Sequence, residues 1–413
     1  MRTGSKRRSG PALRTLVRGA VAALVVLHGL IHLLGAAKGF GWAEVTALSR
    51  PTDRPGGALW LAAAVLVVAA GAGLAGRLPR WWVLGAAAVV VSQAAILTAW
   101  GDAWAGTPAN VVLAVAVVHG AAAEGPWSAR TRYRALARTT AAAANAMVPV
   151  GHGVVTAEAL RTLPAPVARY VEASGAVGRP PVSGFRARIS GRIRSGPDKP
   201  WMTFTGEQTN TYEPDWSRLF LIDATMAGLP TDVLHTFVGA HATMSVRLAS
   251  LVPVTSVDGA VTAELDEAET VTLLNDLVLM APAALVDAPV TWTPIDAHRA
   301  GATFSHGGHT VHAELRFGED GSLVDFVSED RWRSVAGGRF VRQPWSTPVD
   351  ERASFRGRVA MSRGRGRWHP PDEEPFDYLE FRLEDITYLP ERRPATASDA
   401  APVPAPGNLA PAT

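Results

Sequence analysis

The sequence of 413 residues contains no cysteine. The chain therefore forms no disulfide and offers no thiolate as a nucleophile or as a ligand for zinc or an iron–sulfur cluster. Charged residues are also scarce, at 19% of the chain, against about a quarter in a typical soluble domain. The net charge of +3 is too small for a protein dedicated to nucleic acid. We expect no nucleic-acid partner and no cysteine chemistry.

Long apolar runs dominate between Leu16 and Ala123, so we assign residues 1–123 to a membrane region, whereas the composition after Arg130 is that of an ordinary soluble protein. A helix crosses the hydrocarbon layer of a membrane with about 20 apolar residues. The first run exceeds the roughly 7–15 apolar residues of a secretory signal, so we expect it to remain as a span. The sequence predicts a transmembrane region of about four helices, the last with a polar start, at Leu16–Ala37, Ala58–Gly76, Trp81–Ala99 and about Ala109–Ala123.

Basic residues predict how these helices are oriented. The N-terminal tail, the loop between the second and third spans, and the segment after the fourth span hold eleven Lys and Arg, against three in the other two loops. Because basic loops stay in the cytoplasm, we expect the N-terminus and all residues after 125 to be cytoplasmic. The many Arg and Ala residues suggest a GC-rich bacterial genome, and hence a multi-pass protein of the bacterial cytoplasmic membrane.

Three histidines fall within the apolar segments. His28 and His32 share one helix face because they are four residues apart, and His119 lies in the fourth segment. Such imidazoles could bind haem or a metal ion. Alternatively, neutral histidines form hydrogen bonds between packed helices. We favour the hydrogen-bonding alternative and expect no cofactor.

Residues 124–155 predict a helical linker, and residues 156–173 a further helix. From Phe185 onward apolar and polar residues alternate, which is typical of strands with one buried face. Turn residues separate the strands, and Gly307–Gly308 predicts a two-residue hairpin turn. The expected strands are 185–194, 201–212, 217–225, 243–249, 290–296, 301–306, 310–317, 323–330, 354–361 and 378–384.

One long apolar helix, Val261–Leu285, interrupts the strands and is the obvious cover for the buried face. We therefore expect residues 156–390 to form an α+β domain, in which a curved antiparallel sheet or half-barrel wraps around this helix. The space between them is either an apolar cavity or a fully packed core. Residues 391–413, rich in Pro and Ala, are expected to be disordered.

Polar residues on this helix are the main candidates for chemistry. Glu269 and Asp276 lie two turns apart on one helix face, so they could act as a general acid and base. More often, such carboxylates pair with arginines, and Arg331 is one plausible partner. His306, His309 and His312 are metal candidates, but in a flat strand His309 and His312 face opposite sides. Solvent-facing histidines are therefore the favoured interpretation.

Several strings resemble the bacterial DUF6544 family, formerly DUF6920, of uncharacterised proteins. The first is Gly191-Arg-Ile-Arg-Ser-Gly-Pro-Asp-Lys-Pro-Trp201, which continues to Glu207-Gln208. Others are Glu269-Thr-Val-Thr-Leu-Leu-Asn275-Asp276, Ser328-Glu-Asp330-Arg331 and Trp345-Ser-Thr-Pro348. The resemblance spans about residues 160–390 and implies no known activity. The pattern of sheet and helix is more loosely similar to LolA- and LppX-like lipoprotein carriers, which hold acyl chains and work outside the cytoplasmic membrane.

We therefore expect a membrane-anchored protein that binds or shuttles a lipid or other apolar small molecule in a cavity of the β domain. The alternatives are an enzyme that acts on a membrane-derived substrate through Glu269 or Asp276, and a scaffold for a protein partner. The sequence does not determine the oligomeric state. The expected ligand-binding residues are Glu269, Asn275, Asp276, Asp330, Arg331, Glu207 and Trp345.

Overall fold

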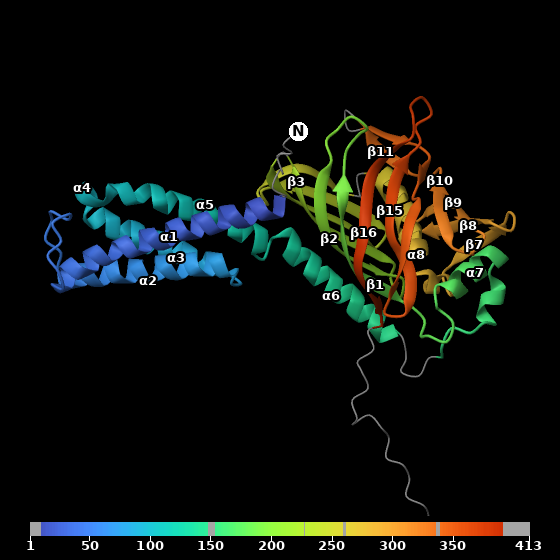
Figure 1. The fold of residues 1–413 in the computed structure, drawn as a ribbon, viewed down its shortest axis with the longest axis horizontal. Coiled ribbons are helices and arrows are strands. Elements are labelled where there is room, and N and C mark those ends of the chain that lie inside the picture. Colours follow the sequence, from blue (N-terminus) through green and yellow to red (C-terminus); the bar gives the residue numbers. More distant parts are fainter. Residues whose placement is uncertain (1–9, 148–152, 227, 259–261, 336–338, 391–413) are drawn as a thin grey trace, which may run out of the picture.

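The computed structural model describes residues 10–147, 153–226, 228–258, 262–335 and 339–390. A rod of helices meets a large β domain (Figure 1). Four segments are long and apolar enough to cross a membrane, the last within the helical stretch Trp100–Ala146. The rod helices are α1 (Gly10–Phe40), α2 (Arg54–Gly76), α3 (Trp81–Thr98), the short α4 (Trp100–Ala103) and η1 (Trp104–Gly106), and α5 (Thr107–Glu124).

Glycines let the first two rod helices approach closely. A Cβ on Gly39 would lie 2.4 Å from the Cα of Gly57, and a Cβ on Gly35 would lie 2.2 Å from the Trp60 ring. Small residues at helix contacts are the usual way for apolar helices to gain van der Waals packing. The contact between α1 and α2 therefore depends on the absence of side chains at these positions.

Replacing Gly35 with alanine should destabilise the rod. We expect Gly35→Ala to cost about 1–3 kcal/mol through overpacking against Trp60, seen as a lower unfolding temperature of the detergent-solubilised chain. Gly19→Ala is the matched control, because a Cβ there meets nothing within 4 Å. Equal unfolding temperatures for the two variants would contradict this packing.

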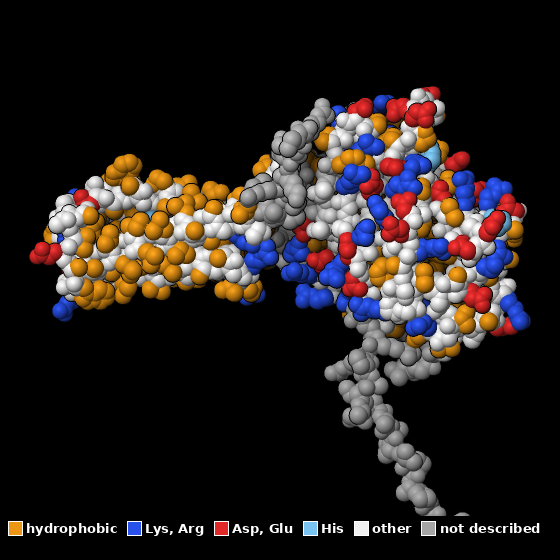
Figure 2. Space-filling view, in the orientation of Figure 1, with side chains coloured by type: hydrophobic (Ala, Val, Ile, Leu, Met, Phe, Trp, Pro, Cys, Tyr) orange, Lys and Arg blue, Asp and Glu red, His pale blue; other side chains and the backbone are white. Residues whose placement is uncertain are grey.

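Basic side chains gather where the rod meets the β domain (Figure 2). α2 ends and α3 begins at this end of the rod, so Arg77 and Arg80 between them belong to it (Figure 1). The arginines that open α6 (Ala129–Met147) follow α5 here as well. The basic residues of the loop between α2 and α3 and of the start of α6 thus lie at one end, whereas residues 1–9 of the N-terminal tail lie outside the described part of the chain. The cytoplasmic assignment of that end stays a prediction.

α6 lies along the outer face of the sheet. Tyr133 and Ala137 on α6 pack against Leu219, Leu221 and Leu234, which point outward from the strands beneath. The predicted linker is therefore helical over most of its described length, and it covers part of the sheet face that was expected to face solvent.

The β domain is one large antiparallel sheet, and the predicted fold class is confirmed in this coarse form. The strand order is β6-β5-β4-β3-β2-β1-β16-β15-β13-β10-β9-β8-β7, with β14 paired to β15 and a separate β11–β12 hairpin. β6 and β7 form the two edges, so the sheet is not closed. Its strands are β1 (Gly184–Ile193), β2 (Met202–Thr211), β3 (Ser217–Met226), β4 (Leu229–Val238), β5 (His241–Leu248), β6 (Val252–Asp258), β7 (Val290–Pro294), β8 (Arg299–His306), β9 (His309–Phe317), β10 (Leu323–Ser328), β11 (Trp332–Val335), β12 (Arg339–Arg342), β13 (Trp345–Ser346), β14 (Val349–Phe355), β15 (Arg358–Trp368) and β16 (Phe376–Leu389).

α8 (Ala263–Met280) connects the two halves of the sheet and lies in its concave face (Figure 1). Every α8 residue from Ala268 to Met280 is buried, and Leu273, Leu274 and Leu277 have no exposed surface. These side chains join one core with inward residues of the strands. The interior around α8 is thus occupied by the side chains of the helix itself, which is the packed alternative of the two considered above.

Three sequence expectations differ from the structure in detail. The expected strand 354–361 is a hairpin, because Arg356 and Gly357 adopt positive φ angles of 53° and 82° and turn the chain. The expected helix 156–173 is interrupted at Pro164, between η2 (Ala159–Thr162) and α7 (Ala165–Ala173). The expected helix Val261–Leu285 ends as an α-helix at Met280 and continues as η4 (Pro282–Val286). Its first residue, Val261, lies outside the described residues, and so does the predicted tail 391–413.

Candidate functional site

A buried arginine joins β3 to α8. Arg218 points inward, because it alternates with the outward Leu219 on the strand. Its Nε donates to Asp276 Oδ2 at 2.7 Å, and its Nη1 donates to Glu269 Oε2 at 3.1 Å. The two carboxylates are two turns apart on one face of α8, as the sequence predicted, and one guanidinium binds both of them.

Further polar groups complete this ionic cluster, which comprises Arg218, Glu269, Asp276, Arg331 and their hydrogen-bond partners. Gln208 and Asn210 of β2 donate side-chain amide hydrogens to Asp276, at 2.7 and 3.2 Å. Arg331 lies 3.7 Å from Glu269 and stacks on the Trp345 ring, 4.8 Å from its centroid. The predicted pairing of Arg331 with the helix carboxylates is thus present.

The cluster holds Glu269 in its charged form. Burial alone would raise the pKa of this carboxyl, but the positive groups His235, Arg218 and Arg331 outweigh it and lower the pKa to about 2. His235 is positive at that pH, although burial lowers its own pKa to about 4. Near pH 7 Glu269 is therefore charged and His235 is neutral. A general acid needs a raised pKa, which Glu269 lacks.

The remaining predicted ligand-binding residues lie apart from this cluster. Asn275 donates to the Thr347 hydroxyl at 2.6 Å. Asp330 accepts from the His312 backbone at 2.7 Å and pairs with Arg342. Glu207 lies on the outer face of the sheet, where Arg130 of α6 donates to it at 3.0 Å. The seven predicted residues therefore do not form one site.

The sequence analysis missed Arg218, Gln208 and His235. A signal was available for Arg218, because it shares the strand face of Phe220 and Ile222, which the alternation of β3 directs inward. A charged residue on the buried face of a strand requires a partner. The partner on α8, some fifty residues away, could not be read from local pattern.

Removing Arg218 should destabilise the domain strongly. Arg218→Met leaves two buried carboxylates without their shared cation. Removing one partner of a buried ion pair lowers the free energy of unfolding by about 3–5 kcal/mol. Arg299→Met is the control, since Arg299 pairs with Asp296 at the surface, where such pairs contribute about 0–1 kcal/mol. Equal losses of unfolding temperature in the purified chain would show that the cluster does not hold the fold.

His235 should make stability depend on pH. The pKa of His235 in the folded chain is about 4, below the ordinary 6.5. Between these two pH values the unfolded chain binds a proton that the folded chain does not, so stability falls as the pH falls. Between pH 7 and pH 4 the wild type should lose up to about 3 kcal/mol more stability than His235→Gln. Thermal unfolding of both proteins across this range is the measurement, and parallel curves would contradict the buried neutral state.

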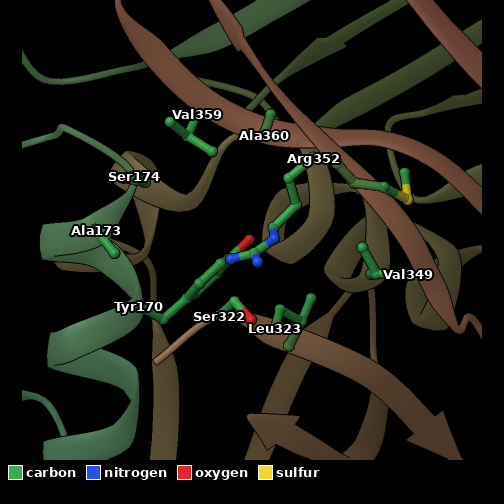
Figure 3. Close-up of a pocket in the computed structure, with 10 residues that line it drawn as sticks. Tyr170, Ala173, Ser174, Ser322, Leu323, Val349, Arg352, Val359 and Ala360 are labelled. Carbon is green, nitrogen blue, oxygen red and sulfur yellow. The ribbon is translucent and has the colours of Figure 1, made fainter. Parts of the chain in front are cut away.

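A small cavity lies at the end of the core beside α7 (Figure 3). Tyr170, Leu323, Val349 and Arg352 are among its lining residues, and its volume is about 20 Å³. A water molecule needs roughly 10–15 Å³ by this measure. The cavity therefore has room for about one water molecule and not for an acyl chain.

A much larger hollow lies on the outside of the sheet, and we call it the arginine groove. Its volume is about 510 Å³, within the roughly 300–1,000 Å³ of ligand pockets. α6 forms one wall, and β1, β2 and β16 form the floor. The lining residues are Tyr133, Arg134, Ala137, Arg138, Arg186, Ala187, Arg188, Glu207, Gln208, Thr209, Asp385 and Thr387.

The rod histidines belong to a buried hydrogen-bond network. His32 Nδ1 donates to the carbonyl of His28 at 3.0 Å, and His32 Nε2 lies 2.8 Å from the Ser92 hydroxyl oxygen. His28 Nε2 lies 3.1 Å from the side-chain oxygen of Asn110. These bonds tie α1 to α3 and α5.

His119 lies about 13 Å further along α5 than Asn110. There it donates to the carbonyl of Ala249 at 2.9 Å. The geometry therefore does not gather the three proposed haem or metal ligands.

In the β8–β9 hairpin, His306 and His309 lie next to each other, but His312 does not join them. His306 and His309 are cross-strand partners around Gly307–Gly308, as predicted. His306 packs against the rings of Phe237 and Phe304. His312 instead lies 3.0 Å from Asp330. Within the described ranges no three His, Asp or Glu side chains are grouped as a metal site would require.

The profile of a family of unknown function, DUF6544, matches residues 153–381, which is more than half of the chain. The chain belongs to this family. The resemblance seen in the sequence motifs is thereby confirmed. No curated protein matches the chain.

A structure comparison found solved structures that are similar to part of this member of DUF6544. A DUF1329 family protein from Desulfovibrio piger is 12% identical, with a TM-score of 0.31 over 51% of this chain and 88% of its own. A LolA superfamily protein from Nitrosomonas europaea is 12% identical, with a TM-score of 0.29 over 56% and 93%. The second of these matches agrees with the looser likeness to LolA-like proteins noted in the sequence.

Proposed function

We propose that the protein is a membrane-anchored, non-catalytic lipid-binding protein that holds the head group of an anionic lipid in the arginine groove. The four apolar helices of the rod span the bacterial cytoplasmic membrane in this proposal, with the basic end of the rod and the β domain on the cytoplasmic side. The observation that carries the proposal is the position of this groove, whose α6 wall begins five residues after α5 ends.

The charge of the groove favours an anion. Its lining holds four arginines and two carboxylates. Arg188 lies 3.6 Å from Asp385, whereas Arg134 and Arg138 have exposed side chains and no carboxylate partner among the described residues. Guanidinium groups bind phosphate oxygens in pairs, and such charged hydrogen bonds are stronger than neutral ones. A lipid phosphate is the anion available beside a membrane helix.

The shape of the groove favours an amphipathic ligand. Tyr133 and Ala137 contribute to the lining of the groove, although both side chains pack mainly against leucines of the sheet, so the apolar part of the ligand would extend along α6 toward the rod. α6 continues from the membrane end of the rod along the sheet (Figure 1), so a lipid could keep its chains near the membrane while its head lies against the sheet. Arg130 anchors this end of α6 through Glu207 and Asp223.

The β interior is less suited to either of the functions first considered. A lipid between the sheet and α8 would have to displace buried leucines and the ionic cluster. Catalysis by Glu269 or Asp276 would require substrate to reach carboxylates that Arg218 already binds. We therefore place the ligand outside the sheet and propose no reaction.

Lipid retention by the purified chain tests this proposal. The full chain in detergent is incubated with phosphatidylglycerol, and bound lipid is counted by native mass spectrometry. We expect Arg134→Ala with Arg138→Ala to weaken binding of one lipid at least tenfold, since a hydrogen bond to a charged group contributes about 1.5–3 kcal/mol.

Arg299→Ala with Arg363→Ala serves as the matched control, because both arginines lie outside the groove lining. Phosphatidylcholine provides a second control with a zwitterionic head. The proposal is wrong if wild type and both double variants retain phosphatidylglycerol equally, or if phosphatidylcholine binds the groove as tightly.

A further inference from the structure

We infer that the tips of the β3–β4 and β5–β6 hairpins insert into the membrane interface beside α5 and form a second attachment of the β domain. This inference rests on the membrane placement of the rod proposed above, and it does not depend on which ligand fills the arginine groove. We call the four residues Leu229, Leu251, Val252 and Val254 the membrane tips.

The membrane tips form one apolar patch. Their side chains are 47%, 41%, 58% and 51% exposed. Leu248 pairs with Val252 on one side and with Thr231 on the other, so the ends of the three strands lie side by side. The amide of Ala249 also donates to the carbonyl of Pro230 at 2.6 Å. Large apolar residues gathered on a surface usually contact another apolar phase.

A hydrogen bond fixes the height of this patch along the rod. The carbonyl of Ala249, two residues before Leu251, accepts from His119 of α5 at 2.9 Å. His119 lies five residues before the end of α5 at Glu124, which is about 7 Å along a helix. The β5–β6 turn therefore lies beside the last turns of α5. Figure 1 shows the green and yellow strands meeting the rod at this end.

Aromatic and basic residues mark the same level as an interface. A Cβ on Gly120, the residue after His119, would lie 2.8 Å from the Trp81 ring. Trp81 begins α3 at this end of the rod. Trp81 itself is buried among the rod helices, whereas Trp127, between α5 and α6, is 86% exposed, and tryptophan favours the boundary between hydrocarbon and head groups. Arg247, exposed near the tips, can extend its guanidinium toward lipid phosphates.

The bilayer fits this patch better than a second copy of the chain. β6 is an edge strand, which could pair with another edge strand. However, the patch is continuous with α5 through the His119 hydrogen bond, and any partner docked there would have to displace the lipid that surrounds the rod. Apolar side chains at this level gain by leaving water for the acyl boundary.

The absence of cysteine makes a direct test possible. Val252→Cys and Val254→Cys are labelled with an environment-sensitive fluorophore, and the full chain is reconstituted in phosphatidylcholine–phosphatidylglycerol vesicles. Val324→Cys on β10 is the matched control, because Val324 is 47% exposed and far along the sheet from β6. Val65→Cys in the middle of α2, 60% exposed, reports on the span itself.

We expect spin-labelled lipids to quench the fluorophores at 252, 254 and 65 at least twofold more than at 324, and aqueous iodide to show the reverse order. Quenching at 65 but not at 252 or 254 would overturn the inference while leaving the lipid-binding proposal intact. A fluorophore at 252 that is protected from iodide but not quenched by lipid, in a chain that also forms cross-links between copies, would indicate a dimer interface. That result would also overturn the inference. Absence of lipid quenching at 65 would overturn both proposals.

Discussion

The structure of the β domain depends on the shared binding of two α8 carboxylates by Arg218. A sheet with two free edges has no covalent or hydrogen-bonded closure, so the helix in its concave face must be held by side chains. The hydrophobic effect that buries the α8 leucines is non-directional, whereas hydrogen bonds to a charged group have defined donors and acceptors. The two bonds from Arg218, at 2.7 and 3.1 Å, define one register and one rotation of α8. Buried charges thus supply the directionality that the leucines lack.

This constraint also moves the search for function to the outside of the sheet. A core that buries charged groups and leucines around one helix has little reason to open for a ligand. The outer face is different, since α6 covers only part of it and leaves the arginine groove beside the end of the rod. The proposed lipid binding, the proposed membrane placement of the rod and the proposed contact of the hairpin tips with the interface all rest on one arrangement, in which α5 and α6 join the sheet to the rod.

Local sequence pattern predicted most of the elements, but it missed strands such as β4 and β6 and failed where distant segments meet. The turn at Gly307–Gly308 was predictable because both glycines occupy positive φ angles that the motif demands. The turn at Arg356–Gly357 was hidden, because an arginine in that position continues an alternating pattern. Glu269 and Asp276 were predicted on one helix face, yet Arg218 was not recognised as their partner. The arginine groove could not be predicted, since Arg134 and Arg186 come to line one groove only when α6 docks on the outer face of the sheet.

The most direct test is an experimental structure of the full chain in a lipid nanodisc containing phosphatidylglycerol. The account predicts a lipid phosphate within hydrogen-bond distance of arginines in the groove, with α8 still packed inside the sheet. It is contradicted by lipid density between α8 and the sheet, or by a rod that lies outside the bilayer.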